Sequence, residues 1–324
     1  MDIKAFGENV IGNLEKVMIG KRAAVEMIVV GLLCQGHVLI EDVPGVGKTV
    51  LARSLARSLD CNFSRIQFTP DMLPSDVTGV SIYDQSKKKF EFRPGPILGQ
   101  IVLADEINRA TPKTQAALLE AMEERQVTVD GVTHPLPKPF MVLATQNPID
   151  YEGTFPLPEA QLDRFLLRVR LGYPSPLDEV RILEEQQLQH PLETLQPVVE
   201  TSEIMAVAEE VKKVFVSPPV KKYIVDLNRR TRETGDVYLG SSPRGSLGLF
   251  RASQAWAALQ GRGYVLPDDV QAMAVPVLGH RIIVSPAARL RDLGADRIVE
   301  EILHGLPVPG GDFQADVSQK KVRE

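Results

Sequence analysis

Cysteine is scarce in this sequence of 324 residues, and its pattern argues against one class of site. The two cysteines, Cys34 and Cys61, form no C-x-x-C pair and belong to no Cys/His cluster, so a metal site built on thiolates is not expected. We interpret both as small buried apolar residues of a protein that works in a reducing compartment.

Long apolar runs are also missing. The most apolar early stretch, MIVVGLLC from Met27 to Cys34, is far shorter than the roughly 20 residues that a membrane-spanning helix needs. The N-terminal segment MDIKAFGENV does not have the charged-then-apolar layout of a signal peptide. We therefore expect a cytoplasmic protein with no membrane insertion.

The chain has no excess of positive charge. It carries 37 Lys and Arg against 42 Asp and Glu, for a net charge of -5. Proteins that bind phosphate backbones carry surplus Lys and Arg, so this balance argues against a general nucleic-acid binder. The 44% of hydrophobic residues is enough for a real core, and the length is enough for two domains.

The first half of the chain alternates short apolar runs with helical patterns. This alternation predicts an α/β fold around a mostly parallel sheet. The expected strands are residues 37–41, 63–68, 100–105, 140–146 and 165–171. Two hairpins are expected as insertions: Ser81–Phe92, with a basic tip, and Gln126–Leu136, with an Asp130-Gly131 turn.

The pattern changes after Leu171. The segment GYPSPLDE carries two prolines and a glycine and is typical of a linker, and every strong segment beyond it has a helical pattern. We therefore predict an α/β domain over residues 1–172, a smaller all-helical lid domain over residues 173–307, and a flexible tail over residues 308–324.

The stretch LIEDVPGVGKTVLARSL, from Leu39 to Leu55, has the pattern of a phosphate-binding loop between a strand and a helix. Backbone N–H groups and the helix N-terminus favour phosphate oxygens. Lys48 adds positive charge at the β- and γ-phosphates, and Thr49 supplies a hydroxyl to Mg²⁺. The expected nucleotide-binding residues are Asp42, Val43, Pro44, Gly45, Val46, Gly47, Lys48, Thr49 and Val50.

One position departs from the usual loop pattern, G-x-x-x-x-G-K-[ST]. Asp42 stands where the pattern has its first glycine, whose role is backbone geometry. Aspartate tolerates unusual backbone angles better than most residues, though glycine remains easier. A carboxylate aimed at phosphates would be repelled, so we expect the Asp42 side chain to turn away from them.

Two further strands end in polar residues. The apolar strand of IVLADEINR ends in Asp105, expected to hold Mg²⁺ through water, and Glu106, expected to polarise the attacking water as a general base. Asn147 follows the strand of MVLATQ and is expected to orient water near the γ-phosphate, although Asn-Pro is also a common turn former.

These motifs together resemble those of the AAA+ ATPases. VPGVGKT is similar to the family's Walker A motif, VLADE to Walker B and Asn147 to sensor 1. EAQLDRF resembles the arginine-finger segment, which implies that Arg164 reaches the γ-phosphate in the neighbouring subunit. SPRGSLGLFRASQAWA resembles sensor 2, with Arg244 acting in cis or in trans. Arg109 is a further interface candidate; each of these arginines is otherwise an ordinary surface or helix-start residue.

Longer segments resemble the MoxR branch of that family: FEFRPGPI, ADEINRATPKTQAALLEAMEE and ATQNPIDYEGTFPLPEAQLDRF. The resemblance implies an AAA+ P-loop NTPase core with two hairpin insertions, Mg²⁺-dependent hydrolysis of ATP to ADP and phosphate, and a homo-oligomeric ring of six subunits. It also implies chaperone-like remodelling or maturation of partner complexes, typically with von Willebrand factor A domains. Ile19 and Gly20 resemble the adenine-facing segment, with ordinary hydrophobic packing an equal alternative.

Other functions stay open at this point. Helicase-like relatives use similar hairpins to contact DNA, and Lys87, Lys88 and Lys89 at one hairpin tip would suit such a contact, a protein partner, or a solvated turn that protects a strand edge. The motor subunit of a metal chelatase is a second alternative. A non-hydrolysing nucleotide-gated scaffold is a third, and the Asp105-Glu106 pair argues against it.

Overall fold

The chain forms two compact units, residues 1–210 and 211–324, in a computed structural model that describes residues 2–147 and 153–310. The division falls later than the predicted boundary at residue 172. Hydrogen bonds explain this difference, because Val198 N donates to Ser58 O at 3.0 Å and the Arg57 side chain donates to the backbone carbonyls of Leu192 and Glu193. Most of the predicted tail, from residue 311 on, lies outside the described residues.

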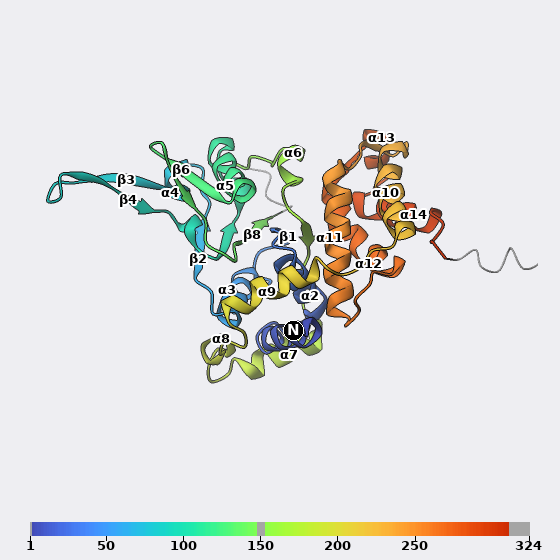
Figure 1. Ribbon diagram of the computed structural model, residues 1–324, viewed down its shortest axis with the longest axis horizontal. Helices are drawn as coiled ribbons and strands as arrows, with labels where there is room; N and C mark the ends of the chain where they lie inside the picture. Colours follow the sequence, from blue (N-terminus) through green and yellow to red (C-terminus); the bar gives the residue numbers. More distant parts are fainter. Residues whose placement is uncertain (1, 148–152, 311–324) are drawn as a thin grey trace, which may run out of the picture. The chain divides into compact units, whose positions relative to one another are not determined.

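A five-stranded sheet forms the centre of the first unit (Figure 1). Its spatial order is β2 (Phe63–Gln67), β5 (Ile101–Asp105), β8 (Met141–Gln146), β1 (Val38–Glu41) and β9 (Leu167–Val169). These neighbours pair in parallel, and the register sets Gln67 beside Asp105 and Glu41 beside Gln146. The five predicted strands are confirmed, and their carboxyl ends lie at one edge.

Helices cover both faces of this sheet because successive strand residues point to opposite sides. On one side, α2 (Arg22–Leu33) comes so close that a Cβ on Gly31 would lie 2.7 Å from Val38 Cγ2. On the other side, Leu39 and Val142 share a buried core with Leu118 of α5 (Pro112–Glu124). Further helices complete the layers: α1 (Ile3–Glu15), α3 (Lys48–Ser58) and α4 (Pro74–Thr78).

Both predicted hairpin insertions are present. β3 (Gly79–Asp84) pairs with β4 (Lys89–Pro94), and Figure 1 shows this hairpin extending away from the central sheet. β6 (Gln126–Val129) pairs with β7 (Val132–Pro135). The turn of the second hairpin has positive φ at both Asp130 (50°) and Gly131 (78°), as a two-residue turn of this type requires.

The C-terminal part of the first unit is mainly helical. α6 (Glu159–Leu162) precedes β9, and α7 (Pro176–Glu185), α8 (Pro191–Thr194) and α9 (Thr201–Val211) follow it. None of the α7 residues is buried in the structure.

The second unit is mainly helical, with α10 (Pro218–Glu233), α11 (Pro243–Leu259), α12 (Pro267–Leu278), α13 (Pro286–Arg289) and α14 (Ala295–Gly305). The sequence did not predict its small antiparallel sheet, in which β10 (Val237–Leu239) pairs with β11 (Ile283–Val284). Strands of three and two residues are too short to show a period of two.

Two expectations drawn from what the sequence lacks can be compared with the structure. Cys34 and Cys61 are half-buried rather than fully buried, and they form no disulfide with each other. Burial raises the pKa of the Cys61 thiol above its usual value. Within residues 2–147 and 153–310, every helix is too short or too polar to cross a lipid bilayer.

Candidate nucleotide site

The loop between β1 and α3 has the backbone geometry of a phosphate cradle. Gly45 and Gly47 have φ values of 86° and 92°, a region that favours glycine. No atom lies within 4 Å of the position that a Cβ on Gly45 would take. Gly47 caps α3, so the unpaired N–H groups of the first helical turn lie next to the loop. This arrangement of donors fits the oxygens of a polyphosphate.

A cavity of about 360 Å³ adjoins the loop. Its lining brings together Arg65 of β2, which was not predicted, and predicted residues from three separate segments: Pro44, Gly45, Gly47, Lys48, Thr49, Val50, Asp105, Glu106 and Asn147. The Lys48 ammonium group donates to the Asp42 carbonyl oxygen at 2.5 Å, which keeps it beside the loop. The sheet edge therefore brings residues of the three predicted motifs to one cavity.

Asp42 has a structural role that its sequence context did not reveal. One carboxylate oxygen accepts from its neighbour Val43 N at 2.9 Å. The other accepts from Leu171 N at 2.6 Å and Gly172 N at 2.7 Å, just beyond β9. The side chain is thus directed at the chain after β9, in agreement with the expectation that it turns away from the phosphates, and the Asp42 backbone carbonyl accepts from Lys48.

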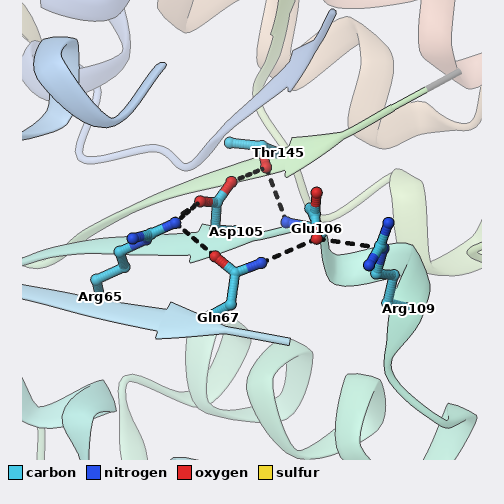
Figure 2. Close-up of polar contacts among 6 residues, drawn as sticks. All are labelled: Arg65, Gln67, Asp105, Glu106, Arg109 and Thr145. Atoms are coloured by element: carbon cyan, nitrogen blue, oxygen red, sulfur yellow. Dashed lines mark hydrogen bonds and ion pairs between the residues drawn. The ribbon is translucent and has the colours of Figure 1, made fainter. Parts of the chain in front are cut away.

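Asp105 ends β5 in a buried position with two polar partners, as Figure 2 shows. The Thr145 hydroxyl of β8 donates to Asp105 Oδ1 at 2.6 Å. Arg65 of β2 donates to Asp105 Oδ2 through Nη2 at 2.6 Å and through Nε at 3.2 Å. A guanidinium therefore balances the carboxylate that is expected to face Mg²⁺.

Glu106 has an unusual backbone conformation. Its φ of 58° and ψ of 49° lie in the left-handed region, which costs a residue with a Cβ on the order of 1–2 kcal/mol. The Glu106 N–H donates to Thr145 Oγ1 at 2.8 Å, so the same hydroxyl that holds Asp105 also fixes this turn (Figure 2). Backbone strain of this kind concentrates at functional sites.

The Glu106 carboxylate is held by two side chains (Figure 2). Oε2 accepts from Gln67 Nε2 at 2.9 Å and lies 3.2 Å from Arg109 Nε. The side-chain oxygen of Gln67, Oε1, accepts in turn from Arg65 Nη2 at 2.5 Å, which fixes the orientation of the side-chain amide. Donors from β2 and from the turn after β5 thus place the carboxylate at the edge of the cavity.

The donor set at this edge fits a nucleotide-bound Mg²⁺. Thr49 and Asp105 line the same cavity and supply one hydroxyl and one carboxylate. In the described part of the chain, no group of three or more His, Cys, Asp and Glu residues could form an all-protein cage. Mg²⁺ is usually held by one or two protein oxygens, with water and phosphate oxygens completing its shell.

The segment expected to face adenine is only partly next to this cavity. The Met18 methyl group lies 3.5 Å from the position of a Cβ on Gly47, so the segment touches the loop. Ile19 is buried, and Gly20, with φ of 69°, packs under the Asp178 carboxylate. Neither Ile19 nor Gly20 lines the cavity, and their contact with the base stays a prediction.

The predicted arginines lie on separate elements. Arg164 follows α6, and its Nε lies 3.9 Å from Glu123 Oε2 of α5; it does not line the cavity of its own subunit. Arg244 lies in the first turn of α11 in the second unit, where its backbone N–H donates to the capping Ser242 hydroxyl at 3.1 Å. Arg109 contacts Glu106.

Three residues of the site were not predicted from the sequence: Arg65, Gln67 and Thr145. The signal for the β2 pair was available, because Arg65 and Gln67 alternate with apolar residues and therefore share one face of a strand. Nothing in the sequence marked Thr145 apart from the residues around it, since its role depends on the register between β5 and β8.

Comparison with known proteins agrees with this geometry. Residues 37–167 match the model of the ATPase family associated with various cellular activities (AAA), and residues 229–302 match the AAA lid domain.

Two curated relatives cover nearly the whole chain. YeaC of Bacillus subtilis (strain 168), described as uncharacterized, is 54% identical over 92% of this chain and 93% of its own. Chaperone MoxR1 of Mycobacterium tuberculosis (strain ATCC 25618 / H37Rv) is 40% identical over 93% of this chain and 82% of its own.

A solved structure matches the fold as a whole. The crystal structure of a protein from Cytophaga hutchinsonii, assigned provisionally as an ATPase, superposes with a TM-score of 0.88 at 38% identity. The match covers 94% of this chain and 97% of that one.

Proposed function

This chain belongs to the MoxR family of AAA ATPases, and from that premise we propose that it binds ATP with Mg²⁺ and hydrolyses it to remodel partner proteins. The observation that supports hydrolysis most directly is the Thr145 hydroxyl. It holds the Asp105 carboxylate and the strained Glu106 turn together at the edge of the cavity that the phosphate loop lines.

The residues have distinct roles in the proposed reaction. Backbone donors of the loop and Lys48 bind the phosphates. Thr49, and Asp105 through water, would hold Mg²⁺, which would neutralise developing charge. Glu106 takes the proton of the attacking water, and Asn147 orients that water. If Oε2 rather than Oε1 of Glu106 is to take the proton, it has to exchange the donors Gln67 and Arg109 for water.

Hydrolysis in this proposal depends on assembly. Arg164 does not line the cavity of its own subunit, which supports its action at the γ-phosphate of a neighbour in a homo-oligomeric ring, with six subunits as the family resemblance implies. Arg244 would act from the lid, in cis or in trans. An arginine is suited to this role because its charge is permanent and its donors are planar.

Two measurements test the assembly. We expect the specific activity to fall on dilution below the assembly threshold, and Arg164→Ala to abolish hydrolysis while leaving ATP bound. A strict monomer with concentration-independent activity, or wild-type rates from the Arg164→Ala protein, would contradict the ring.

The partner in this proposal is a protein. The name of MoxR1 describes a chaperone, and the family resemblance points to partners with von Willebrand factor A domains. A pull-down with ATP-loaded Glu106→Gln protein, followed by mass spectrometry, should identify a protein with such a domain. Capture of clients that all lack this domain would contradict the partner assignment.

The helicase-like alternative finds little support at the hairpin tip. Lys87 pairs with Glu91 at 2.7 Å and with Asp84 at 3.8 Å, and Lys89 pairs with Glu91 at 3.5 Å. These acids offset much of the positive charge that a phosphate backbone would need. Filter binding of DNA across a salt series checks this, and a steep salt slope would favour the helicase-like alternative over the protein partner.

A further inference from the structure

Gln115 lies where α5 begins, in a position with no exposure to solvent. Its side-chain NH2 group lies within hydrogen-bond distance of three backbone carbonyl oxygens, Ile107 O at 3.1 Å, Ala110 O at 3.1 Å and Phe155 O at 2.9 Å, which its two hydrogens share. The first two belong to the turn that directly follows Glu106, and the third belongs to the segment that leads toward Arg164. One amide group therefore joins two segments that the function proposed above assigns to different active sites.

A second contact fixes the same place. Phe155 N donates to Asn108 O at 2.6 Å, so both backbone polar groups of Phe155 are bonded to the Glu106 turn or to Gln115. From Phe155 the chain continues through the buried Leu157 into α6, after which comes Arg164. Arg164 in turn lies near Glu123 at the far end of α5. The helix thus contacts this segment at both of its ends.

The presence of glutamine at position 115 indicates that this site needs a hydrogen-bond donor. All three neighbours of the amide nitrogen are acceptors, so the nitrogen and oxygen of the amide can be assigned without ambiguity. Among the residues that the structure describes, the amide oxygen has no hydrogen-bond partner, and an unpaired buried acceptor is costly. A leucine or methionine would fill the space without that cost, but it could not bond the three carbonyls.

We propose that Gln115 is a positioning residue that couples the two active sites on either side of a protomer. By fixing Phe155 to the turn behind Glu106, it sets where the protomer presents Arg164 to its neighbour. This inference rests on the proposed function, since it requires that Arg164 acts in trans. Gln115 itself does not line the nucleotide cavity.

Gln115→Met tests the proposal, with Gln254→Met as its matched control. Gln254 is also buried in a helix, and its side chain also donates to backbone carbonyls, Val214 O at 2.7 Å and Lys212 O at 3.2 Å, in the second unit. We expect both variants to bind ATP. Only Gln115→Met should show a lower kcat, by about 10-fold or more with little change in KM. The reason is that even a small displacement of a catalytic group lowers the rate steeply.

Assemblies that mix two variants distinguish a misplaced Arg164 from a general structural defect in the Gln115→Met protein. Glu106→Gln protomers cannot hydrolyse ATP but carry an intact Arg164, so an excess of them should restore hydrolysis at Gln115→Met sites. An excess of protomers with both Glu106→Gln and Arg164→Ala should not restore it. Wild-type kcat from Gln115→Met, equal losses in Gln254→Met, or no rescue by intact fingers would each overturn the proposal.

A second variant keeps the test valid if Gln115→Met does not fold. Gln115→Glu retains the shape, and burial raises the pKa of such a carboxyl so that its protonated form can donate one bond. Its kcat relative to wild type should rise as the pH is lowered from 8 to 6, and a flat ratio would contradict the proposal. If Glu106→Gln hydrolysed ATP at the wild-type rate, the proposed function would fail instead, whatever the Gln115 variants did.

Discussion

The carboxylate of Asp42 accepts a hydrogen bond from the backbone N–H of Leu171 at 2.6 Å. This contact, with a second one to Gly172 N, ties the start of the phosphate loop to the end of β9. The residue that departs from the usual loop pattern therefore contributes to the fold rather than to phosphate binding through its side chain.

Asp42→Gly, which restores the usual loop glycine, should destabilise the protein. It leaves three backbone donors, those of Val43, Leu171 and Gly172, without their charged acceptor, and we expect the free energy of unfolding to fall by about 2–4 kcal/mol. The Kd for ATP should change by less than about 3-fold, or roughly 0.7 kcal/mol. Urea denaturation and nucleotide titration measure the two effects. Asp42→Asn, which keeps one acceptor oxygen, should lose less stability, and an unchanged stability of Asp42→Gly would contradict this account.

Thr145→Val should lower kcat with little change in KM. Valine matches threonine in size, but it removes the donor to Asp105 and the acceptor of the Glu106 N–H. We expect a loss on the order of 10-fold to 100-fold, corresponding to about 1.4–2.8 kcal/mol of transition-state stabilisation. Steady-state ATPase kinetics provide the measurement. Thr128→Val, on the exposed surface of β6, is the control and should keep wild-type kinetics.

His37 should make the first unit sensitive to acid. Its ring is buried between Val142 N, which donates to Nδ1 at 3.0 Å, and Met122 O, which lies 3.1 Å from Nε2. Burial, with the nearby Arg125 charge, lowers the pKa of His37 from 6.5 to about 3. Below pH 6.5, the His37 ring is therefore protonated in the unfolded chain while it stays neutral in the folded chain. Stability falls as the pH drops from 6.5 toward 3, by about 1.4 kcal/mol per pH unit.

The contribution of His37 can be isolated by comparing variants. The free energy of unfolding can be measured between pH 4.5 and 7 by urea unfolding followed through hydrogen exchange of β8 peptides. Its slope against pH should be smaller in His37→Gln than in the wild type, by the amount that corresponds to one proton. The exposed His304 is the matched control, and His304→Gln should keep the wild-type slope. Equal slopes for wild type and His37→Gln would show that the buried ring does not carry this acid sensitivity.

Local patterns in the sequence were sufficient for the strands, the hairpins and the nucleotide loop. Each strand near the loop is a short apolar run, and Asp130-Gly131 defines its turn through backbone angles that few other pairs adopt. Long-range contacts were not predictable. The partnership of Asp42 with Leu171, and of Thr145 with both acids, depends on which strands become neighbours and in which register. The division after residue 210 likewise depends on side chains such as Arg57 that bond to distant carbonyls.

The fate of ATP bound to the Glu106→Gln protein tests the central claim most directly. The protein is incubated with ATP and Mg²⁺, separated rapidly from free nucleotide, and the bound nucleotide is identified over time. Lys48→Ala serves as the control that should retain no nucleotide, because it lacks the charge beside the loop. The account predicts that intact ATP stays bound to Glu106→Gln over many wild-type turnover times. Conversion of the bound ATP to ADP at the wild-type rate would contradict it.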